Sequence, residues 1–172
     1  LIIRIKSHHP NGLNGNIQLN RPKDEEVETA KTFTEKGSLF MEGQITQRKG
    51  TFNSKPNPIL DGVLFQTIVK PSNLEGTLTV TDKNIELKGV KELELRIVSN
   101  SSFYSKDYKN QNRTQLNAAV GKSLEALKQI HIEDHKSLFN RVVLDLKTDN
   151  SLQHIPTNQR IEEVKQGAVD LE

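Results

Sequence analysis

The feature that most constrains the fold of this chain is a change in the spacing of its apolar residues near Thr114. Before that point, short stretches alternate apolar and polar residues, as in "ELELRIVS" (92–99), where Leu93, Leu95 and Ile97 alternate with charged residues. This period of two is typical of a strand with one buried and one wet face. After Thr114 the apolar residues recur every three or four positions, which is typical of one face of a helix. The sequence therefore predicts sheet first and helices afterwards.

The first hundred residues predict about eight short strands, which favours a mainly β (α+β) fold built on an antiparallel β-sandwich. Gly37 is placed for a hairpin loop, and the apolar alternation on both sides of Asp82, Lys83 and Asn84 predicts a tight hairpin there. The Asn- and Pro-rich stretch 46–62 is expected to be a loop. The predicted strands cover residues 1–7, 17–20, 27–34, 38–45, 63–71, 76–81, 84–89 and 92–104.

Beyond the strands, apolar residues at spacings of four, four, three and three predict one long helix that packs against the sheet. These residues are Leu116, Val120, Leu124, Leu127 and Ile130. Gly121 weakens this helix, since glycine is a poor helix former. The preceding Lys-rich stretch 105–113 is expected to be a solvated loop.

The rest of the chain predicts a second helix at 133–141, a strand at 142–147 and a short third helix at 156–167. Pro156 and Thr157 are suited to open the third helix, and Gly167 is suited to close it. The helices are therefore expected to follow the sandwich.

Two histidines lie four positions apart in the segment 130–146, at His131 and His135. On one helix they would share a face, as the histidines of zinc-binding helices do, but the next residue after the first is Ile132 rather than the Glu that acts as base there. A third ligand from His8, His9, His154 or a carboxylate is not indicated by any spacing. We therefore expect no metal site.

We instead expect the first helix to end at Ile130 and a second to begin near Glu133. Glu133 and Asp134 would then lie in a first turn, where the helix dipole favours negative charge, and His131 would lie in the joint. The pair His8 and His9 precedes Pro-Asn-Gly and is interpreted as turn chemistry.

Further candidate sites are equally weak. Asp61 is interpreted as part of a hairpin rather than a catalytic carboxylate, and the glycosylation patterns at Asn100 and Asn112 are expected by chance. No nucleotide-binding or serine-hydrolase motif occurs. The sequence assigns no catalytic, cofactor-binding or metal-binding residue, and no cofactor is expected.

The charge balance and the apolar content narrow the possible partners. There are 24 basic and 22 acidic residues, so the net charge is +2. This small excess does not indicate the cluster of basic residues that a nucleic-acid-binding surface needs. No apolar run approaches the ~20 residues that cross a bilayer. The absence of cysteine excludes disulfides and thiolate-bound metals. The chain begins on an apolar strand without an initiator Met, so we expect it to be a piece of a longer protein.

Three stretches resemble glycoside hydrolase family 95, the α-L-fucosidases and their relatives. "GVLFQTIVKPSNLEGTLTVTDKNIELKGVKELELRIVSNSSFY" (62–104) resembles the family's strands that end in a Thr-Ser/Asn-Phe/Tyr segment. "HIEDHKSLFNRVVLDL" (131–146) resembles H-x-x-D-Y-x-x-L-F-x-R-V-x-L-x-L, and "IPTNQRIEEVKQG" (155–167) resembles P-T-D-E-R-L…G. The chain departs from the pattern at Ser101, His135 and Asn158, where the family usually has Thr, Tyr and Asp.

The resemblance implies that 1–111 are the latter part of a sandwich of the galactose-mutarotase-like or super-sandwich type, the N-terminal domain of a larger enzyme. It implies that 112–172 form a helical linker with one short strand, leading to a catalytic α/α toroid that these residues lack. The chain would then be a non-catalytic piece of an enzyme that hydrolyses terminal α-L-fucosyl or related linkages with inversion.

The same resemblance implies which partners the chain would have: the rest of the parent chain and, through the whole enzyme, an oligo- or polysaccharide. A periplasmic or extracellular location in a bacterium would suit the parent. The alternative hypothesis is a free-standing β-sandwich that binds glycans or a protein.

Overall fold

The structure is a computed structural model, and it describes residues 1–24, 28–47, 59–144 and 154–168. Strands dominate the described residues, so the mainly β fold predicted from the sequence is confirmed. The strands are β1 (Ile2–Lys6), β2 (Leu13–Ile17), β3 (Ala30–Glu35), β4 (Ser38–Gln47), β5 (Ile59–Leu74), β6 (Thr77–Val80), β7 (Ile85–Val90) and β8 (Glu92–Ser101). The helices are α1 (Tyr108–Val120), α2 (Leu124–Phe139) and α3 (Thr157–Lys165).

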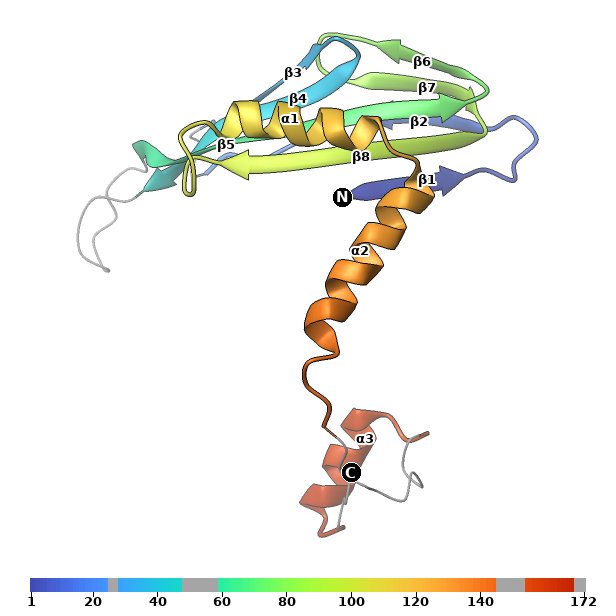
Figure 1. Ribbon diagram of the computed structural model, residues 1–172, viewed down its shortest axis with the longest axis vertical. Helices are drawn as coiled ribbons and strands as arrows, with labels where there is room; N and C mark the ends of the chain where they lie inside the picture. Colours follow the sequence, from blue (N-terminus) through green and yellow to red (C-terminus); the bar gives the residue numbers. More distant parts are fainter. Residues whose placement is uncertain (25–27, 48–58, 145–153, 169–172) are drawn as a thin grey trace. The chain divides into compact units, whose positions relative to one another are not determined.

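The strands form two antiparallel sheets (Figure 1). The larger has five strands in the order β1-β8-β5-β4-β3, and the smaller has three in the order β2-β7-β6. The chain divides into two compact units, Leu1–Leu124 and Glu125–Glu172. Both sheets and α1 therefore belong to the first unit, which we call the β-domain.

Two hairpins confirm the predicted turn chemistry. Glu35 pairs with Ser38 across a two-residue turn in which Lys36 and Gly37 both have positive φ, the conformation that such turns require. Val80 pairs with Ile85 across the predicted second hairpin, which the Thr81 amide closes by donating to the Asn84 carbonyl at 2.9 Å.

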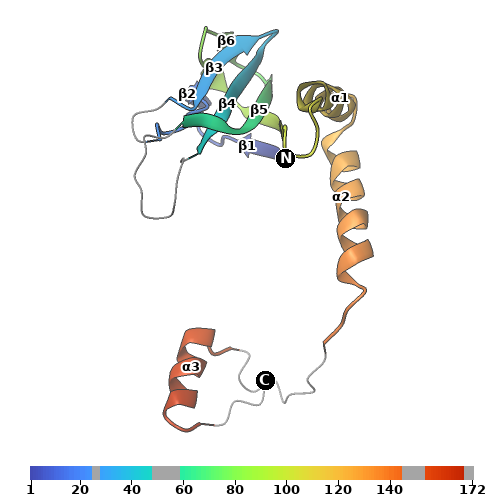
Figure 2. The ribbon, with the colours of Figure 1, turned by 90° about the vertical axis from the view of Figure 1, so that its left-hand side faces the viewer.

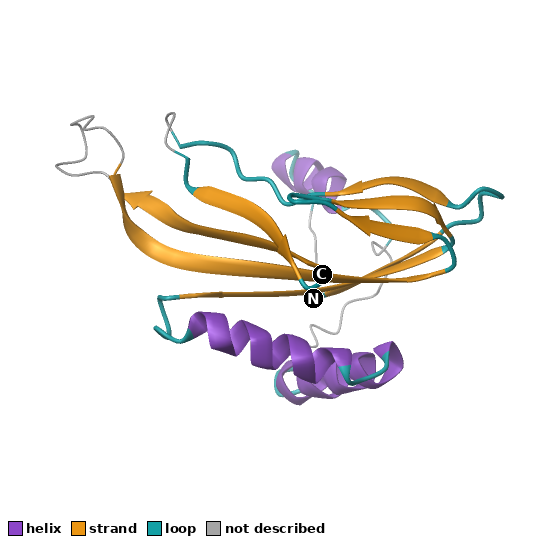
Figure 3. Ribbon diagram, turned by 90° about the horizontal axis from the view of Figure 1, so that it is seen from above, coloured by secondary structure: helices purple, strands orange, loops and turns teal. Residues whose placement is uncertain are grey.

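The two sheets share an apolar core. Leu39 and Val69 of the larger sheet pack with Ile85 of the smaller one, and all three are at most 2 % exposed. Leu95 and Ile97 pack against this cluster and Leu93 is buried, so the face predicted from their alternation is confirmed. Figure 3 shows the smaller sheet, the larger sheet and α1 as successive layers of the β-domain.

The opposite face of the larger sheet is covered by α1, which is seen end-on beside the sheet in Figure 2. Leu116 of α1 packs with Phe40 and Ile68, and Phe33 and Val98 pack around them. The face of β8 that the alternation places in solvent is therefore half-covered, because a helix lies on it. Because α1 forms a third layer on this face, polar side chains of β8 that point to it lie beside the helix rather than fully in solvent.

The prediction of one long helical stripe is wrong in two respects. The solvated loop expected at 105–113 is in part helical, since α1 begins at Tyr108, and Tyr108, Asn112 and Leu116 are its buried residues. The helix ends at Val120, which is 50 % exposed, and Gly121 is its C-cap. The physical reason is the sequence Gly121-Lys122-Ser123, which combines a weak helix former with a residue type that favours the start of a new helix.

The remaining helix predictions are partly confirmed. α2 runs without interruption from Leu124 to Phe139, so the break expected between Ile130 and Glu133 is wrong; strong helix formers continue through it. α3 confirms the third helix, and Gly167 closes it with φ 96°. The amides of Gly167 and Ala168 donate to the carbonyls of Val164 and Glu163, the arrangement typical of a glycine-terminated helix.

Three strand predictions need correction. β2 lies at Leu13–Ile17 rather than 17–20, because its pairing with β7 outweighs the poor strand propensity of its Asn and Gly residues. β5 begins at Ile59, inside the stretch expected to be a loop, while residues 48–58 lie outside the described residues. Residues 142–144 are irregular rather than the predicted strand, and 145–147 lie outside the described residues.

Candidate functional site at the seam between helix and sheet

A chain of polar side chains lies between α1 and the five-stranded sheet, and we call it the seam. Strands β4, β5 and β8 contribute one residue each, and α1 contributes three. The members are Glu42, Gln66, Asn100, Lys109, Asn112 and Gln115. Asn112 is 0 % and Gln66 is 1 % exposed, whereas Gln115 at the edge of the seam is exposed.

Asn112 is the centre of the seam. Its Nδ2 donates to the Gln66 carbonyl at 2.8 Å and to Gln66 Oε1 at 3.0 Å. Its Oδ1 accepts from Asn100 Nδ2 at 2.7 Å, and the same nitrogen donates to Gln115 Oε1 at 2.9 Å. A buried amide is tolerated only when its donors and acceptors are satisfied, so Asn112 fixes α1 at one position along β5 and β8.

Glu42 ends the seam on β4 and is its charged member. Its carboxylate accepts from Lys109 Nζ at 2.9 Å and from Gln66 Nε2 at 2.7 Å. Burial alone would raise the pKa of Glu42, but these two hydrogen bonds and the charges of Lys109 and Lys31 outweigh it, so the pKa lies below the ordinary value. Glu42 is therefore held as a carboxylate that accepts hydrogen bonds.

An open groove of about 460 Å³ lies beside this carboxylate, where β3 begins. Phe65, Tyr108 and Lys109 line it together with Glu42. Gly43 is required here, because a Cβ at this position would lie 2.0 Å from the Thr29 carbonyl oxygen and 2.7 Å from the Phe65 ring. The groove is lined by an ion pair and two aromatic side chains, which suits binding of a polar ligand more than proton transfer.

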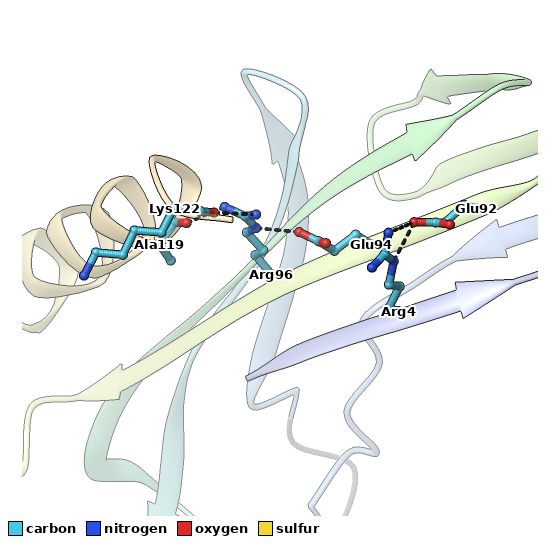
Figure 4. A network of polar contacts seen from close by, with 6 residues as sticks. All are labelled: Arg4, Glu92, Glu94, Arg96, Ala119 and Lys122. Atoms are coloured by element: carbon cyan, nitrogen blue, oxygen red, sulfur yellow. Dashed lines mark hydrogen bonds and ion pairs between the residues drawn. The ribbon is translucent and has the colours of Figure 1, made fainter. Parts of the chain in front are cut away.

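A second polar contact fixes the other end of α1. Arg96 of β8 points to the C-terminus of the helix, where its guanidinium donates to the carbonyls of Ala119 and Lys122 (Figure 4). Its Nε donates to Glu94 at 2.7 Å, and both of these side chains are about 15 % exposed. The last carbonyls of a helix lack partners within it. Arg96 donates to one of them, at Ala119, and to the Lys122 carbonyl just beyond the helix, so it holds the C-terminal end of α1.

The neighbouring pair of Arg4 and Glu92 in Figure 4 is a simpler ion pair at the edge of the same sheet. The hydrogen bond from Arg4 holds the pKa of Glu92 below its ordinary value, against the effect of desolvation, and Lys6 adds to it. The Arg4 side chain is 38 % exposed, compared with 14 % for Arg96. The two arginines therefore provide an internal comparison between an edge ion pair and a helix-terminal contact.

The structure places His131 and His135 on the same face of α2, with ring centroids 6.3 Å apart. The expectation that His131 lies in a joint is therefore wrong, because α2 continues through it. His135 in turn stacks on Phe139 at 5.3 Å. Among the described residues, no group of three His, Asp or Glu side chains is arranged to hold a metal ion. Glu133 and Asp134 lie in the middle of α2 rather than in a first turn.

The other sequence candidates lie apart from the seam. His9 begins the predicted turn, in which the Gly12 amide donates to the His9 carbonyl at 3.0 Å, and His8 directly precedes it. His154 is exposed in a turn before α3, and Asp61 lies in β5 with its side chain outside the described residues. Asn112 is fully buried and could not carry a glycan in the folded protein.

Sequence reasoning missed the seam and Arg96. Asn112 lies in a run of polar residues. Nothing in that run shows that this asparagine is buried against the sheet while its neighbours are exposed. The one available signal was the spacing of four between Tyr108, Asn112 and Leu116, which places them on one helix face. Arg96 was taken as a solvent-facing strand residue because the helix that covers it is distant in sequence.

Within the described part of the chain, none of the helices has both the length and the apolar composition that a membrane span requires.

Residues 123–172 match the family model described as glycosyl hydrolase family 95 catalytic domain. The resemblance seen at 131–146 and 155–167 is thereby confirmed, whereas the resemblance at 62–104 lies outside the match and stays a prediction. No curated protein matches the chain. The match begins at Ser123, directly after the Lys122 carbonyl that Arg96 holds.

Proposed function

We propose that this chain, whose residues 123–172 match the family model of the glycosyl hydrolase family 95 catalytic domain, is a non-catalytic part of such an enzyme. The whole enzyme would hydrolyse terminal α-L-fucosyl or closely related linkages in an oligo- or polysaccharide, with inversion at the anomeric carbon. The observation that carries this proposal is the family match, which begins where α1 ends. The fucosyl specificity rests on the resemblance of the sequence motifs.

The chemistry of the seam favours a structural rather than a catalytic role for the β-domain. Inverting hydrolysis needs a protonated carboxyl group as acid and a carboxylate as base, roughly 6.5–9.5 Å apart with a water between. A general acid needs a raised pKa, but the pKa of Glu42 is lowered by its hydrogen bonds from Lys109 and Gln66. Glu42 is therefore suited to fasten α1 and unsuited to protonate a leaving group.

The role that the contacts favour for the β-domain is to hold α1 and the Lys122 carbonyl, directly before the family-matched segment. Asn112 fixes α1 on β5 and β8, and Arg96 holds the two carbonyls at its end. Residues 1–111 would be the sandwich-type domain of the parent enzyme, α1 would be its covering helix, and α2 and α3 would lead into the catalytic toroid.

The experiment compares the protein encoded by the complete gene with residues 1–172 alone, using an aryl α-L-fucoside and the corresponding α-L-galactoside. We expect the complete protein to release the phenol and residues 1–172 to show no turnover. Proton NMR of the first-formed sugar should show the β anomer, which establishes inversion.

A matched control uses Glu42→Gln in the complete protein, which should retain most of the activity because the lowered pKa of Glu42 makes it unsuited to act as the acid. Turnover by residues 1–172 that Glu42→Gln abolishes would place the catalytic machinery in the β-domain and refute the proposal. A complete protein that binds glycans without hydrolysing any aryl glycoside would favour a free-standing binding module instead.

A further inference from the structure

A second concavity of about 620 Å³ lies further along α1, toward its C-terminus, and we call it the basic groove. Its floor is apolar and comes from both the helix and the sheet: Phe40 and Ile68 lie beneath it and Leu116 beside it. Its cationic side chains are Lys36, Lys70 and Arg113. The volume lies within the roughly 300–1,000 Å³ that is typical of ligand pockets.

The groove follows from how the fold is built. The single helix α1 lies over β5 and β8, so the face of β4 beside it has no helix of its own among the described residues (Figure 2). Phe40 of β4 packs against Leu116 at the edge of the part that α1 covers, and it stacks on Phe33 with centroids 5.1 Å apart. The step between helix and strand therefore creates a cleft whose apolar floor is already formed without a ligand.

The cations converge from three elements. Lys36 stands in the β3–β4 turn with φ 49°, an uncommon conformation for a residue other than glycine. Lys70 of β5 reaches under this turn, where its Nζ donates to the Lys36 carbonyl at 3.1 Å. Arg113 is presented by α1 on the same face as Leu116.

Little negative charge opposes these cations. Glu35 is the carboxylate that lines the groove, and it lies 4.0 Å from Lys36 Nζ. Lys70 and Arg113 make no ion pair with any residue that the structure describes, in contrast to Lys109, whose Nζ lies 2.9 Å from Glu42. Three cations against one carboxylate leave the groove positive, so it would attract an anion.

We propose that the basic groove binds a saccharide that carries an anionic group, either a uronate carboxylate or a sulfate ester. The anionic group would lie between Lys70 and Arg113, where a guanidinium and an ammonium can both donate to it. The apolar face of the sugar ring would pack on the floor beside Phe40. That the ligand is a saccharide rests on the proposed function, whereas the negative charge follows from the groove itself.

The test is titration of residues 1–172 with trigalacturonic acid, with a sulfated fucose trisaccharide and with neutral maltotriose, followed by amide NMR shifts. We expect both anionic sugars to shift amides of residues 36–40, 68–70 and 113–120, and maltotriose to leave them unchanged. Lys70→Gln and Arg113→Gln should each weaken binding by on the order of tenfold, the effect of losing one charged hydrogen bond.

The matched control is Lys83→Gln, which removes an exposed lysine from the β6–β7 turn outside the groove and should leave the affinity unchanged. Thermal melting of each variant checks that it is folded; if Arg113→Gln unfolds the chain, Arg113→Lys replaces it and should weaken binding while keeping the charge. Equal binding of maltotriose would overturn the proposal.

Two further probes separate the saccharide from other anions. Citrate that shifts the same amides with equal affinity would reduce the groove to a general anion site, and a glutamate tripeptide that binds more tightly would favour a protein partner; either result would overturn the proposal. The outcome is independent of catalysis. If the complete protein leaves aryl fucosides intact while trigalacturonic acid still binds, the proposed function fails and the basic groove stands.

Discussion

The β-domain and the helices that follow it differ in how their apolar residues are used. The β-domain buries Leu39, Ile68 and Ile85 almost completely between its layers. Helices α2 and α3 have no buried residue, although their apolar content is not low; Ile130, Leu138 and Phe139 are between 48 % and 70 % exposed. The β-domain therefore has a core of its own, whereas α2 and α3 lack one within the described residues.

The comparison teaches that helical periodicity predicts a helix but does not predict burial. Leu116 and Leu138 are the same residue type on two helices, yet Leu116 packs with Phe40 and Ile68 while Leu138 is 58 % exposed. Burial depends on what faces the helix. The following variants test that difference, beginning with the largest expected effect.

Leu116→Ala should lower the free energy of unfolding of the β-domain by about 3 kcal/mol, because it removes buried apolar volume from a closed cluster. Leu138→Ala should change it by less than about 0.5 kcal/mol, since exposed positions contribute little. Urea denaturation followed by circular dichroism measures both. If the two substitutions cost the same, the distinction between the two regions is wrong.

Asn112→Ala should cost about 2 kcal/mol, because it removes three hydrogen bonds and leaves the buried Gln66 and the half-buried Asn100 with fewer partners. Gln111→Ala on the exposed side of the same helix turn is the control and should cost under about 0.5 kcal/mol. The same denaturation experiment applies. A tolerated Asn112→Ala would mean that the seam does not hold α1.

Arg96→Lys should cost about 1 kcal/mol, because an ammonium cannot donate to the Ala119 and Lys122 carbonyls with the geometry of a guanidinium. Its control, Arg4→Lys, alters an ion pair at the sheet edge and should cost under about 0.5 kcal/mol. Thermal melting compares them, and amide exchange at residues 117–122 should accelerate in Arg96→Lys alone. Equal melting temperatures would assign Arg96 no special role.

Glu42→Gln should have the smallest effect, and it should depend on pH. The pKa of Glu42 is lowered in the folded state, so its ionised form stabilises the protein above the ordinary value of 4.5, and this contribution is lost as the pH falls through the folded-state value. The stability difference between wild type and Glu42→Gln should therefore be constant from pH 7 to 5 and shrink below it. A difference that grows on acidification would mean that the pKa is raised.

Most of the strands could be predicted because they carry their own period of two, whereas β2, with its Asn and Gly residues, does not. The alternation of Leu93, Leu95 and Ile97 predicts the buried face of β8 from neighbouring residues alone, and Gly37 predicts the turn of the β3–β4 hairpin. The extent of α1 could not be predicted, because Tyr108 and Asn112 lie in a polar run and become buried only when β5 and β8 lie beside them. Gly121 could be recognised as a weak point in the predicted helix, but the contacts of Arg96 with the Ala119 and Lys122 carbonyls could not, because they join segments that are separated in sequence.

For the candidate sites too, the sequence predicts only what neighbouring residues encode. His131 and His135 drew attention because their spacing is a local signal, yet the described residues supply no third ligand around them. The seam and the basic groove are assembled from β3, β4, β5, β8 and α1, so their members have no common spacing in the sequence. The family match at 123–172 could be anticipated from the motifs at 131–146 and 155–167, which are local in sequence.

Native-state hydrogen exchange of residues 1–172, read amide by amide, tests the difference between the two regions most directly. Amides that open only by global unfolding should include those of β4, β5 and β8 around Leu39, Ile68 and Val98, and those of α1 around Leu116 should follow them closely. Amides of α2 and α3 should exchange at least a hundredfold faster, on the order expected for helices without buried contacts. Protection of α2 equal to that of β5 would contradict the account, because it would mean that the second region is held as firmly as the β-domain.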